Sequence, residues 1–191
     1  DRSFDQDNQL LYGGGMHRNM FGFYGDTVLV NGRPNYRLEV ASRAYRLRLL
    51  NASNARIYKL AWDDGSPLTV IGTDGGLLEK PETRRYVMLA PSERIDLWVD
   101  FSGRPAGAQM VMRSLGFSGL IPSMAMGMSG DDDAVETFPV FTVAVTRAVS
   151  DSPKLPERLT PIRRYRREDL ANPDNARPIA INMGHMRMSL N

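Results

Sequence analysis

Hydrophobic and polar residues alternate with a period of two through much of the segment from residue 26 to residue 145. In YRLRLLN (45–51), Tyr45, Leu47 and Leu49 fall on one side of an extended chain, and two arginines fall on the other. This pattern is typical of an antiparallel strand with one buried face and one solvated face. The same period, or a short apolar run, marks the further candidate strands TVLVNG (27–32), IYKLAW (57–62), PLTVIGT (67–73), RYVMLA (85–90), ERIDLWVDF (93–101), AQMVMRSLG (108–116) and PVFTVAVTR (139–147).

Turn-forming residues lie between these candidate strands. Asn31-Gly32 predicts a tight turn in which Gly32 supplies a positive φ, and Asp74 followed by two glycines predicts another. Both asparagines of NASNAR (51–56) can bond to nearby backbone and hold an irregular turn, although this segment can also form a helical turn. Strands that recur about every ten residues with polar turns between them indicate an all-β Greek-key sandwich or barrel.

The composition changes near residue 150. Five prolines fall between residues 151 and 178, which disfavours strand pairing, so we expect a long irregular connector over the domain surface. Within it, RRYRRED (163–169) is interpreted as a solvated or salt-bridged face rather than a nucleic-acid patch, because acidic residues follow the arginines at once. The tail RPIAINMGHMRMSLN (177–191) resumes strand-like alternation and stops, as expected of a strand that lacks its partners.

Cysteine is absent from the chain, and its two histidines are His17 and His185. Zinc fingers, thiol catalysis, disulfide scaffolds and iron–sulfur clusters all need cysteine. A blue-copper centre needs two histidines and a thiolate, so this chain cannot build one alone. The net charge of +2 and the lack of a long apolar run predict neither a nucleic-acid partner nor a membrane span.

Methionines supply the candidate metal ligands. Met124, Met126 and Met128 alternate in SMAMGMSGDDD (123–133), and thioethers are soft ligands that suit Cu(I). If the segment is extended, the three side chains share one face. They then either pack in a core, a domain interface or a substrate pocket, or contact Cu(I) from a flexible loop. No residue is assigned a catalytic or cofactor-binding role.

Histidine lies near methionine at two further places. His17 stands between Met16 and Met20 in a glycine-rich segment, which is interpreted either as a loop leading to the first strand or as a weak soft-metal site. His185 has three methionines within three residues of it. In a single strand these side chains divide between the two faces, which argues against one ion bound by all of them.

Four motifs, in this order and spacing, resemble the middle cupredoxin-like domain of three-domain bacterial multicopper oxidases, the group of laccases, cuprous oxidases and bilirubin oxidases. The motifs are GDTVLVNGR (25–33), YRLRLLNASNARIYKLAW (45–62), VIGTDGGLLEKP (70–81) and LAPSERIDLWVDFS (89–102). The resemblance implies a Greek-key β-sandwich or barrel of cupredoxin type with a long irregular C-terminal connector. It divides the chain into a connector from a missing N-terminal domain (1–25), a cupredoxin-like domain (26–150), an interdomain linker (151–178) and the start of a truncated third domain (179–191).

The same resemblance implies where the chemistry lies. In this family the first and third domains carry a mononuclear copper site that takes electrons from substrate and a trinuclear histidine cluster that reduces dioxygen to water. The HxH and HCHxxxH ligand motifs are absent here, so no copper ligand of those centres carries over. We therefore expect a non-catalytic middle domain, inactive alone and without its own cofactor, in a laccase-like oxidase of phenols or Cu(I).

The expected partners are the flanking cupredoxin domains of the same protein, with self-association through exposed domain interfaces as a second expectation. The resemblance also implies a periplasmic or secreted location. A function of a different class is a stand-alone Met-rich copper-binding β-sandwich without enzymatic activity, which would hold Cu(I) through Met124, Met126 and Met128. The abrupt end of the tail argues against such a complete module.

Overall fold

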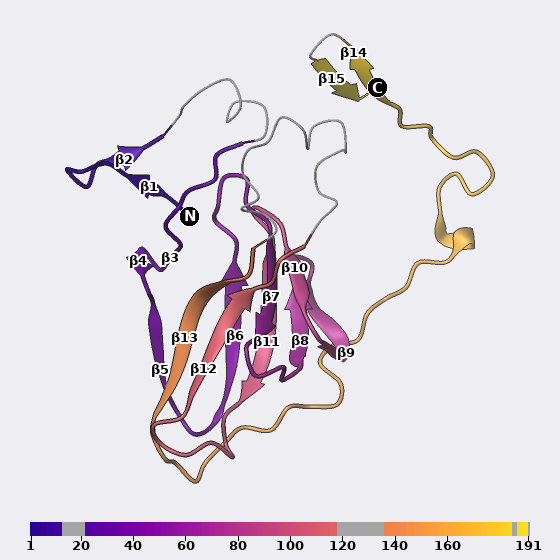
Figure 1. Cartoon of the computed structure of the whole chain (residues 1–191). Coiled ribbons are helices and arrows are strands. Elements are labelled where there is room, and N and C mark those ends of the chain that lie inside the picture. Colours follow the sequence, from indigo (N-terminus) through magenta and orange to yellow (C-terminus); the bar gives the residue numbers. More distant parts are fainter. Residues whose placement is uncertain (13–21, 118–135, 185–186, 191) are drawn as a thin grey trace. The chain divides into compact units, whose positions relative to one another are not determined.

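The computed structural model describes residues 1–12, 22–117, 136–184 and 187–190, and the chain divides into two compact units between Thr160 and Pro161. The strands of the first unit are β1 (Ser3–Phe4), β2 (Leu10–Leu11), β3 (Leu29–Val30), β4 (Arg33–Pro34), β5 (Arg37–Ala41), β6 (Ala44–Leu50), β7 (Tyr58–Trp62), β8 (Leu68–Thr73), β9 (Gly76–Arg84), β10 (Val87–Leu89), β11 (Arg94–Asp100), β12 (Gln109–Ser114) and β13 (Phe138–Arg147) (Figure 1). Among the described residues the helical structure is limited to one 3-10 turn in the second unit, so the all-β prediction is confirmed.

Two sheets form the sandwich of the first unit. One has the strand order β10-β7-β12-β13-β5, and the other has the order β6-β11-β8-β9. The chain passes from one sheet to the other between β5 and β6 and again between β6 and β7, as a Greek-key sandwich requires. Within these sheets the pairings are antiparallel except that of β5 with β13, where Leu38 lies opposite Val143 in a parallel ladder.

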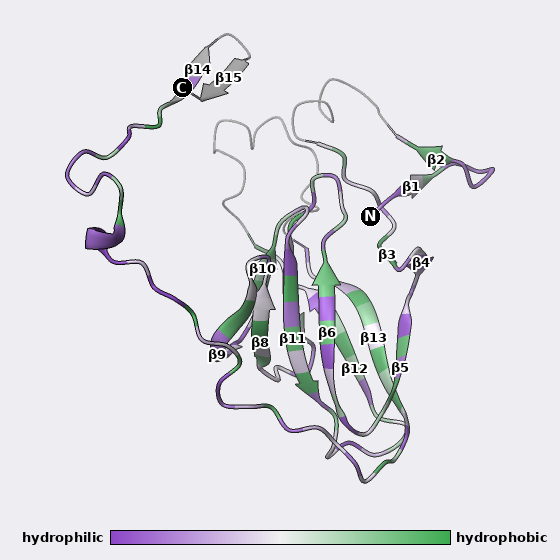
Figure 2. Cartoon of the chain, turned by 180° about the vertical axis from the view of Figure 1, so that it is seen from behind, coloured by the Kyte–Doolittle hydropathy of each residue, from purple (hydrophilic) through white to green (hydrophobic). Residues whose placement is uncertain are grey.

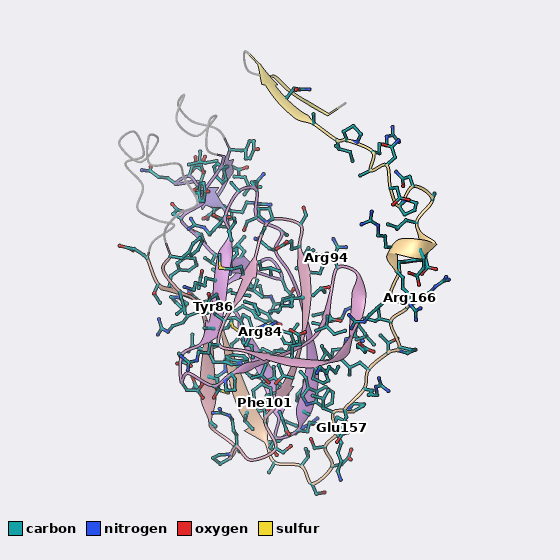
Figure 3. All side chains as sticks on the ribbon, turned by 90° about the vertical axis from the view of Figure 1, so that its right-hand side faces the viewer. Arg84, Tyr86, Arg94, Phe101, Glu157 and Arg166 are labelled. Carbon is teal, nitrogen blue, oxygen red and sulfur yellow. The ribbon has the colours of Figure 1, made fainter. Side chains whose placement is uncertain are left out.

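Apolar side chains from both sheets fill the space between them. The most completely buried are Leu68, Leu97, Phe101, Met112 and Val143, of which Phe101 is labelled in Figure 3. Trp62 meets Phe141 edge to face with 6.2 Å between ring centres, a geometry that adds about 0.5–1.5 kcal/mol to the burial of the rings. Met110 and Met112 belong to this core, which is the packing role that methionine commonly takes.

The predicted alternation is present in β6 and β11. The three apolar residues of β6 that were predicted to face inward pack against the core, and the two arginines between them are exposed; Figure 2 shows the two kinds of residue alternating along the strand. Asp96 of β11 lies beside these arginines. Arg46 Nε is 3.0 Å from Asp96 Oδ2, and Arg48 Nε is 3.6 Å from Asp96 Oδ1. The outer face of β6 is therefore a surface of ion pairs.

The predicted Asn31-Gly32 turn joins β3 to β4. Both residues have positive φ, 50° and 76°, as a type I′ hairpin turn requires, so this prediction is confirmed. The helical turn considered for residues 51–56 is absent, and that expectation is wrong. The reason is local, since the Asn51 side chain takes up backbone groups that a helical turn would need for itself.

The connector after β13 lies on the surface of the first unit. Ser152 Oγ accepts a hydrogen bond from the Ala44 N–H at 2.9 Å, and the Leu159 N–H donates to the backbone oxygen of Glu79 at 2.9 Å. Residues 148–160 are described throughout and form no strand. The predicted irregular connector over the domain surface is therefore present in this part of the chain.

The second unit contains η2 (Arg167–Asp169), β14 (Ile181–Gly184) and β15 (Arg187–Leu190). Ion pairs join Arg166 to Glu168 at 3.4 Å and Arg167 to Asp174 at 3.3 Å, which confirms the salt-bridged interpretation of RRYRRED. The tail does not form the single unpaired strand that was expected. Its two halves pair with each other as the antiparallel strands β14 and β15, so the partner of each half lies within the tail itself.

Candidate functional site

One asparagine at the end of β6 holds two loops together. Asn51 Nδ2 donates to the backbone oxygens of Arg56 at 2.7 Å and Leu89 at 2.9 Å, and Asn51 Oδ1 accepts the N–H of Ser53 at 2.9 Å. The Asn51 backbone also bonds to two residues of APSER (90–94). The predicted irregular turn is confirmed at Asn51, and the structure adds that this residue joins the NASNAR and APSER motifs.

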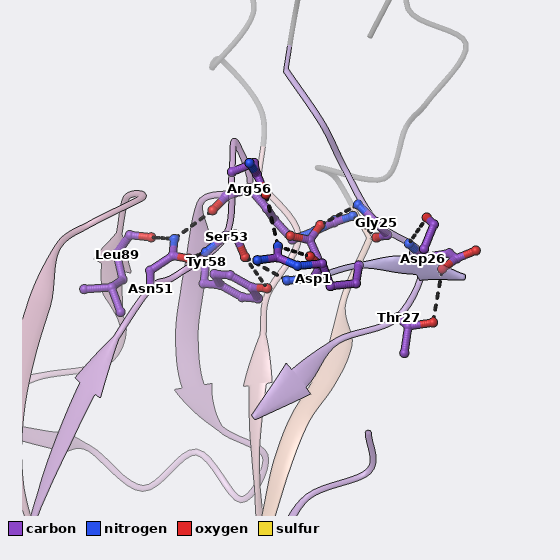
Figure 4. Close-up of polar contacts among 12 residues, drawn as sticks. Asp1, Gly25, Asp26, Thr27, Asn51, Ser53, Arg56, Tyr58 and Leu89 are labelled. Carbon is purple, nitrogen blue, oxygen red and sulfur yellow. Dashed lines mark hydrogen bonds and ion pairs between the residues drawn. The ribbon is translucent and has the colours of Figure 1, made fainter. Parts of the chain in front are cut away.

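Arg56 lies at the centre of a buried polar cluster that joins the first residues of the chain to the sandwich (Figure 4). Its side chain is 7% exposed, and that of Asp1 is 0% exposed. Arg56 Nε donates to Asp1 Oδ2 at 2.7 Å, and Arg56 Nη2 donates to the Gly25 oxygen at 2.9 Å. The guanidinium carbon also lies 5.3 Å from the ring centre of Tyr24 and 5.4 Å from that of Phe138. Such partners offset the cost of taking a charge out of water.

Gly25 lets the first residues of the chain approach the sandwich closely. Its N–H donates to Asp1 Oδ2 at 2.8 Å, and a Cβ at this position would lie 2.3 Å from the Arg2 nitrogen. The Arg2 and Thr27 backbones exchange two hydrogen bonds, both of 2.9 Å. The opening segment is therefore fixed by backbone pairing as well as by the buried ion pair.

The other polar residues of the turn motifs make contacts within a turn or between two turns. Glu93 Oε2 accepts the N–H of Ala90 at 2.6 Å, and Arg94 Nε lies 2.8 Å from Asp74 Oδ1. Asn54 differs from its prediction, because its Oδ1 accepts a hydrogen bond from Arg2 Nη1 at 3.0 Å instead of bonding to nearby backbone. Asn54 thus helps to hold the opening segment.

An apolar cleft of about 850 Å³ opens where the two sheets separate. The strands β5 and β6 belong to different sheets and are joined only by Ser42 and Arg43. Next to this corner the Ala41 N–H donates to the Tyr45 hydroxyl at 2.9 Å. Away from this corner the cleft is lined by apolar residues that include Leu38, Leu47, Leu49, Leu60, Val140 and Phe141. It is a surface to which an apolar group can bind.

The predicted metal ligands do not fall within this site. Met124, Met126, Met128 and His17 lie outside the described residues, as does His185, so their predicted roles stay predictions. Within the described part of the chain, no group of three or more His, Cys, Asp or Glu side chains could hold a metal ion. The described donor set does not fit a copper centre of the blue or trinuclear kind, both of which need histidine.

Sequence reasoning missed Arg56 and Asp1 as partners. They are 55 residues apart, and nothing in the local pattern of either segment indicates the other. Arg56 itself carried no usable signal, since arginine is mostly exposed and almost never fully buried unless it is paired. The cleft was also missed, because strand patterns do not state which strands lie at the edges of a sheet.

Known proteins resemble the chain in sequence and in fold, although no family model matches it. It is 42% identical to a laccase of Bacillus subtilis (strain 168) over 97 residues, which are 51% of this chain and 19% of the relative. It is 54% identical to the cell division protein FtsP of Xenorhabdus nematophila over 81 residues, 42% of this chain and 17% of the relative. The solved structure of the 2F4 variant of the multicopper oxidase McoA from Aquifex aeolicus matches 100% of this chain, with a TM-score of 0.79 and 32% identity.

The chain is a cupredoxin-like part of the multicopper oxidase family. It corresponds to 39% of the McoA chain, and its matched residues span less than a fifth of the two curated relatives. The relatives favour the oxidase family over the stand-alone copper-binding sandwich that the methionines suggested. The described residues contain no helix with the length and apolarity needed to cross a membrane.

Proposed function

We propose that this chain is the middle, non-catalytic domain of a laccase-like oxidase that takes single electrons from phenols or Cu(I) and reduces dioxygen to water. The support for this proposal comes from two observations taken together. The whole chain matches a multicopper oxidase, yet its sequence contains no cysteine and only two histidines. A blue-copper site needs a thiolate and two histidines, so flanking domains must supply the copper ligands.

In this proposal the chain acts as a spacer that fixes the position of its neighbours. The buried pair of Asp1 and Arg56 and the close approach at Gly25 hold the opening segment rigidly on the sandwich. The connector from residue 151 is held by hydrogen bonds through Ser152 and Leu159. Copper centres on the outer domains would depend on such anchoring, because electron transfer between them requires a fixed separation.

The test compares the full-length parent protein with residues 1–191 after both have been loaded with copper. The parent is expected to bind copper, to show the intense visible absorption of a Cu(II)–thiolate bond, and to consume dioxygen when given a phenol or Cu(I). Residues 1–191 are expected to show neither the absorption nor the oxygen uptake. Copper-dependent oxygen uptake from residues 1–191 alone, or a parent protein that shows neither the absorption nor the uptake, would refute the proposal.

A second candidate comes from the resemblance to a protein named for cell division. A parent of that kind would share the fold and would not need to be an oxidase. Copper analysis separates the two candidates, since a parent that purifies without copper, and takes none up, supports the second. The periplasmic or secreted location is part of the first proposal and rests on family resemblance.

A further inference from the structure

Strand β6 has an open edge that borders the apolar cleft. Its sheet has the strand order β6-β11-β8-β9. Among the described residues, β11 is the only strand that pairs with β6 in this sheet. Five consecutive residues of β6, 46–50, line the cleft, and so do residues 51–53 directly after the strand. An edge strand with unpaired backbone groups is a template for a further strand.

The register of the β6–β11 ladder shows which backbone groups point out from this edge. The Asn51 N–H donates to the Glu93 oxygen at 3.1 Å and so faces β11, whereas the Ala44 N–H donates to Ser152 Oγ and so faces away. The ladder runs from residue 44 to residue 50 without a bulge. In such an antiparallel ladder, the backbone groups of successive residues point alternately toward the partner strand and away from it. The N–H and C=O groups of Arg46 and Arg48 therefore point out from the edge.

The rim of the cleft carries positive charge. Arg46 and Arg48 share a single carboxylate, that of Asp96, and the Arg48 side chain is 78% exposed. Arg2 also lines the cleft, and its Nη1 bonds to neutral oxygens of Asp1 and Asn54. Binding of a segment here would be favoured if the segment placed acidic side chains beside these arginines and apolar side chains in the cleft.

The same charges disfavour a second copy of this chain as the occupant. If two β6 edges paired antiparallel about Leu47, Arg46 of one chain would lie opposite Arg48 of the other. Like charges directly opposite each other destabilise a strand pair, and charged edges of this kind oppose edge-to-edge association.

We propose that the β6 edge and the cleft bind an extended segment from a flanking part of the same full-length polypeptide, as an added antiparallel or parallel strand with apolar and acidic side chains in alternation. The apolar side chains enter the cleft between β5 and β6, and the acidic ones lie beside Arg46 and Arg48 on the outer face. This inference rests on the proposed function, because it requires that the chain be one domain of a longer protein.

The test is hydrogen–deuterium exchange at single-residue resolution on the intact full-length protein. The amides of Leu47 and Leu49 face β11 and serve as internal controls that are protected in either case. The amides of Arg46 and Arg48 are expected to exchange within about tenfold of those controls. Exchange of Arg46 and Arg48 at the rate of open amides, with Leu47 and Leu49 still protected, would overturn the inference.

A charge reversal tests the chemistry of the occupant. In full-length Arg48→Glu, the Arg46 amide is expected to exchange at least about tenfold faster. The matched control is Arg84→Glu on β9, at the opposite edge of the same sheet, where the arginine also has an acidic neighbour; it should leave exchange in β6 unchanged. Protection that survives Arg48→Glu would overturn an acidic occupant.

Two further measurements on the same sample separate the remaining outcomes. Protection that appears only at high protein concentration, together with a dimeric mass, would overturn the inference in favour of a second copy. Copper content and oxygen uptake test the proposed function independently. An active copper protein with an open β6 edge would therefore refute this inference alone, while a copper-free protein would refute the proposed function whatever the exchange at β6.

Discussion

Replacement of Arg56 by methionine tests the anchor of the opening segment. Methionine keeps much of the side-chain volume and removes the charge, the hydrogen bonds to Asp1 and Gly25, and both ring contacts. The Asp1 carboxylate, which is 0% exposed, is then left buried without its counter-ion. Loss of one partner of a buried ion pair costs about 3–5 kcal/mol of stability.

The ring contacts of Arg56 with Tyr24 and Phe138 would add about 0.5–1 kcal/mol each by the usual strength of cation–π contacts. The sum is a large part of the roughly 5–15 kcal/mol that stabilises a typical domain. Arg56→Met is therefore expected to unfold at clearly lower urea concentration, and Arg56→Lys, which retains a charge, at an intermediate one.

The assay is a double-mutant cycle with Asp1→Asn, Arg56→Met and the pair together, measured as the free energy of unfolding in urea. Fluorescence of the two tryptophans, Trp62 in the core and the partly buried Trp98, reports unfolding. The expected coupling between the two positions is about 1–3 kcal/mol, the upper range for residues in direct contact.

A second ion pair in the same unit provides a matched control. Arg104 Nη2 lies 2.8 Å from Asp64 Oδ2, nearly the same distance, but both side chains are about one-third exposed. Its coupling is expected to stay below about 1 kcal/mol, because solvent screens it. Equal coupling in the two cycles, or a coupling below about 0.5 kcal/mol between Asp1 and Arg56, would refute burial as the source of the anchor's strength.

Four further outcomes are expected, each measured by urea or thermal unfolding. Asn51→Ala should cost about 2–3 kcal/mol, because three buried groups lose their partner, and Asn51→Asp should be no better, since a carboxylate cannot donate to two backbone oxygens. Met112→Ala should cost about 2–5 kcal/mol and Met112→Leu less than about 1.5 kcal/mol; similar costs for both would contradict close packing. Gly25→Ala should destabilise the first unit by forcing the Arg2 backbone away. Burial alone would raise the pKa of Asp64, but hydrogen bonds from Ser66 and Arg104 outweigh it and lower that pKa. The contribution of Asp64 to stability is thus present above the unfolded pKa of about 3.9 and is lost as the pH falls through the lower folded pKa, so Asp64→Asn should flatten the acid limb of the pH profile slightly.

Local patterns in the sequence predicted most of the sandwich. The alternation in residues 45–51 placed three apolar side chains in the core and two arginines outside it. The Asn31-Gly32 pair predicted its turn because few residue pairs accept two positive φ angles. These features are decided by neighbours in the chain, so a single sequence contains them.

The anchor and the cleft depend on contacts between distant segments. Asp1 and Arg56 meet only after the fold has formed. The cleft exists because β5 and β6, which follow each other at one corner, belong to different sheets. Strand order decides both, and periodicity does not contain strand order.

The parallel ladder between β5 and β13 constrains how the first unit can fold. Leu38 pairs with Val143, so one of the first strands of the sandwich has no neighbour in its sheet until the last strand has been made. On a ribosome, β5 and its apolar side chains would wait through the synthesis of about a hundred further residues, during which its backbone is open to wrong partners. Pairing over so long a separation is slow, typically milliseconds to seconds, and the final strand therefore acts as the closing step of assembly.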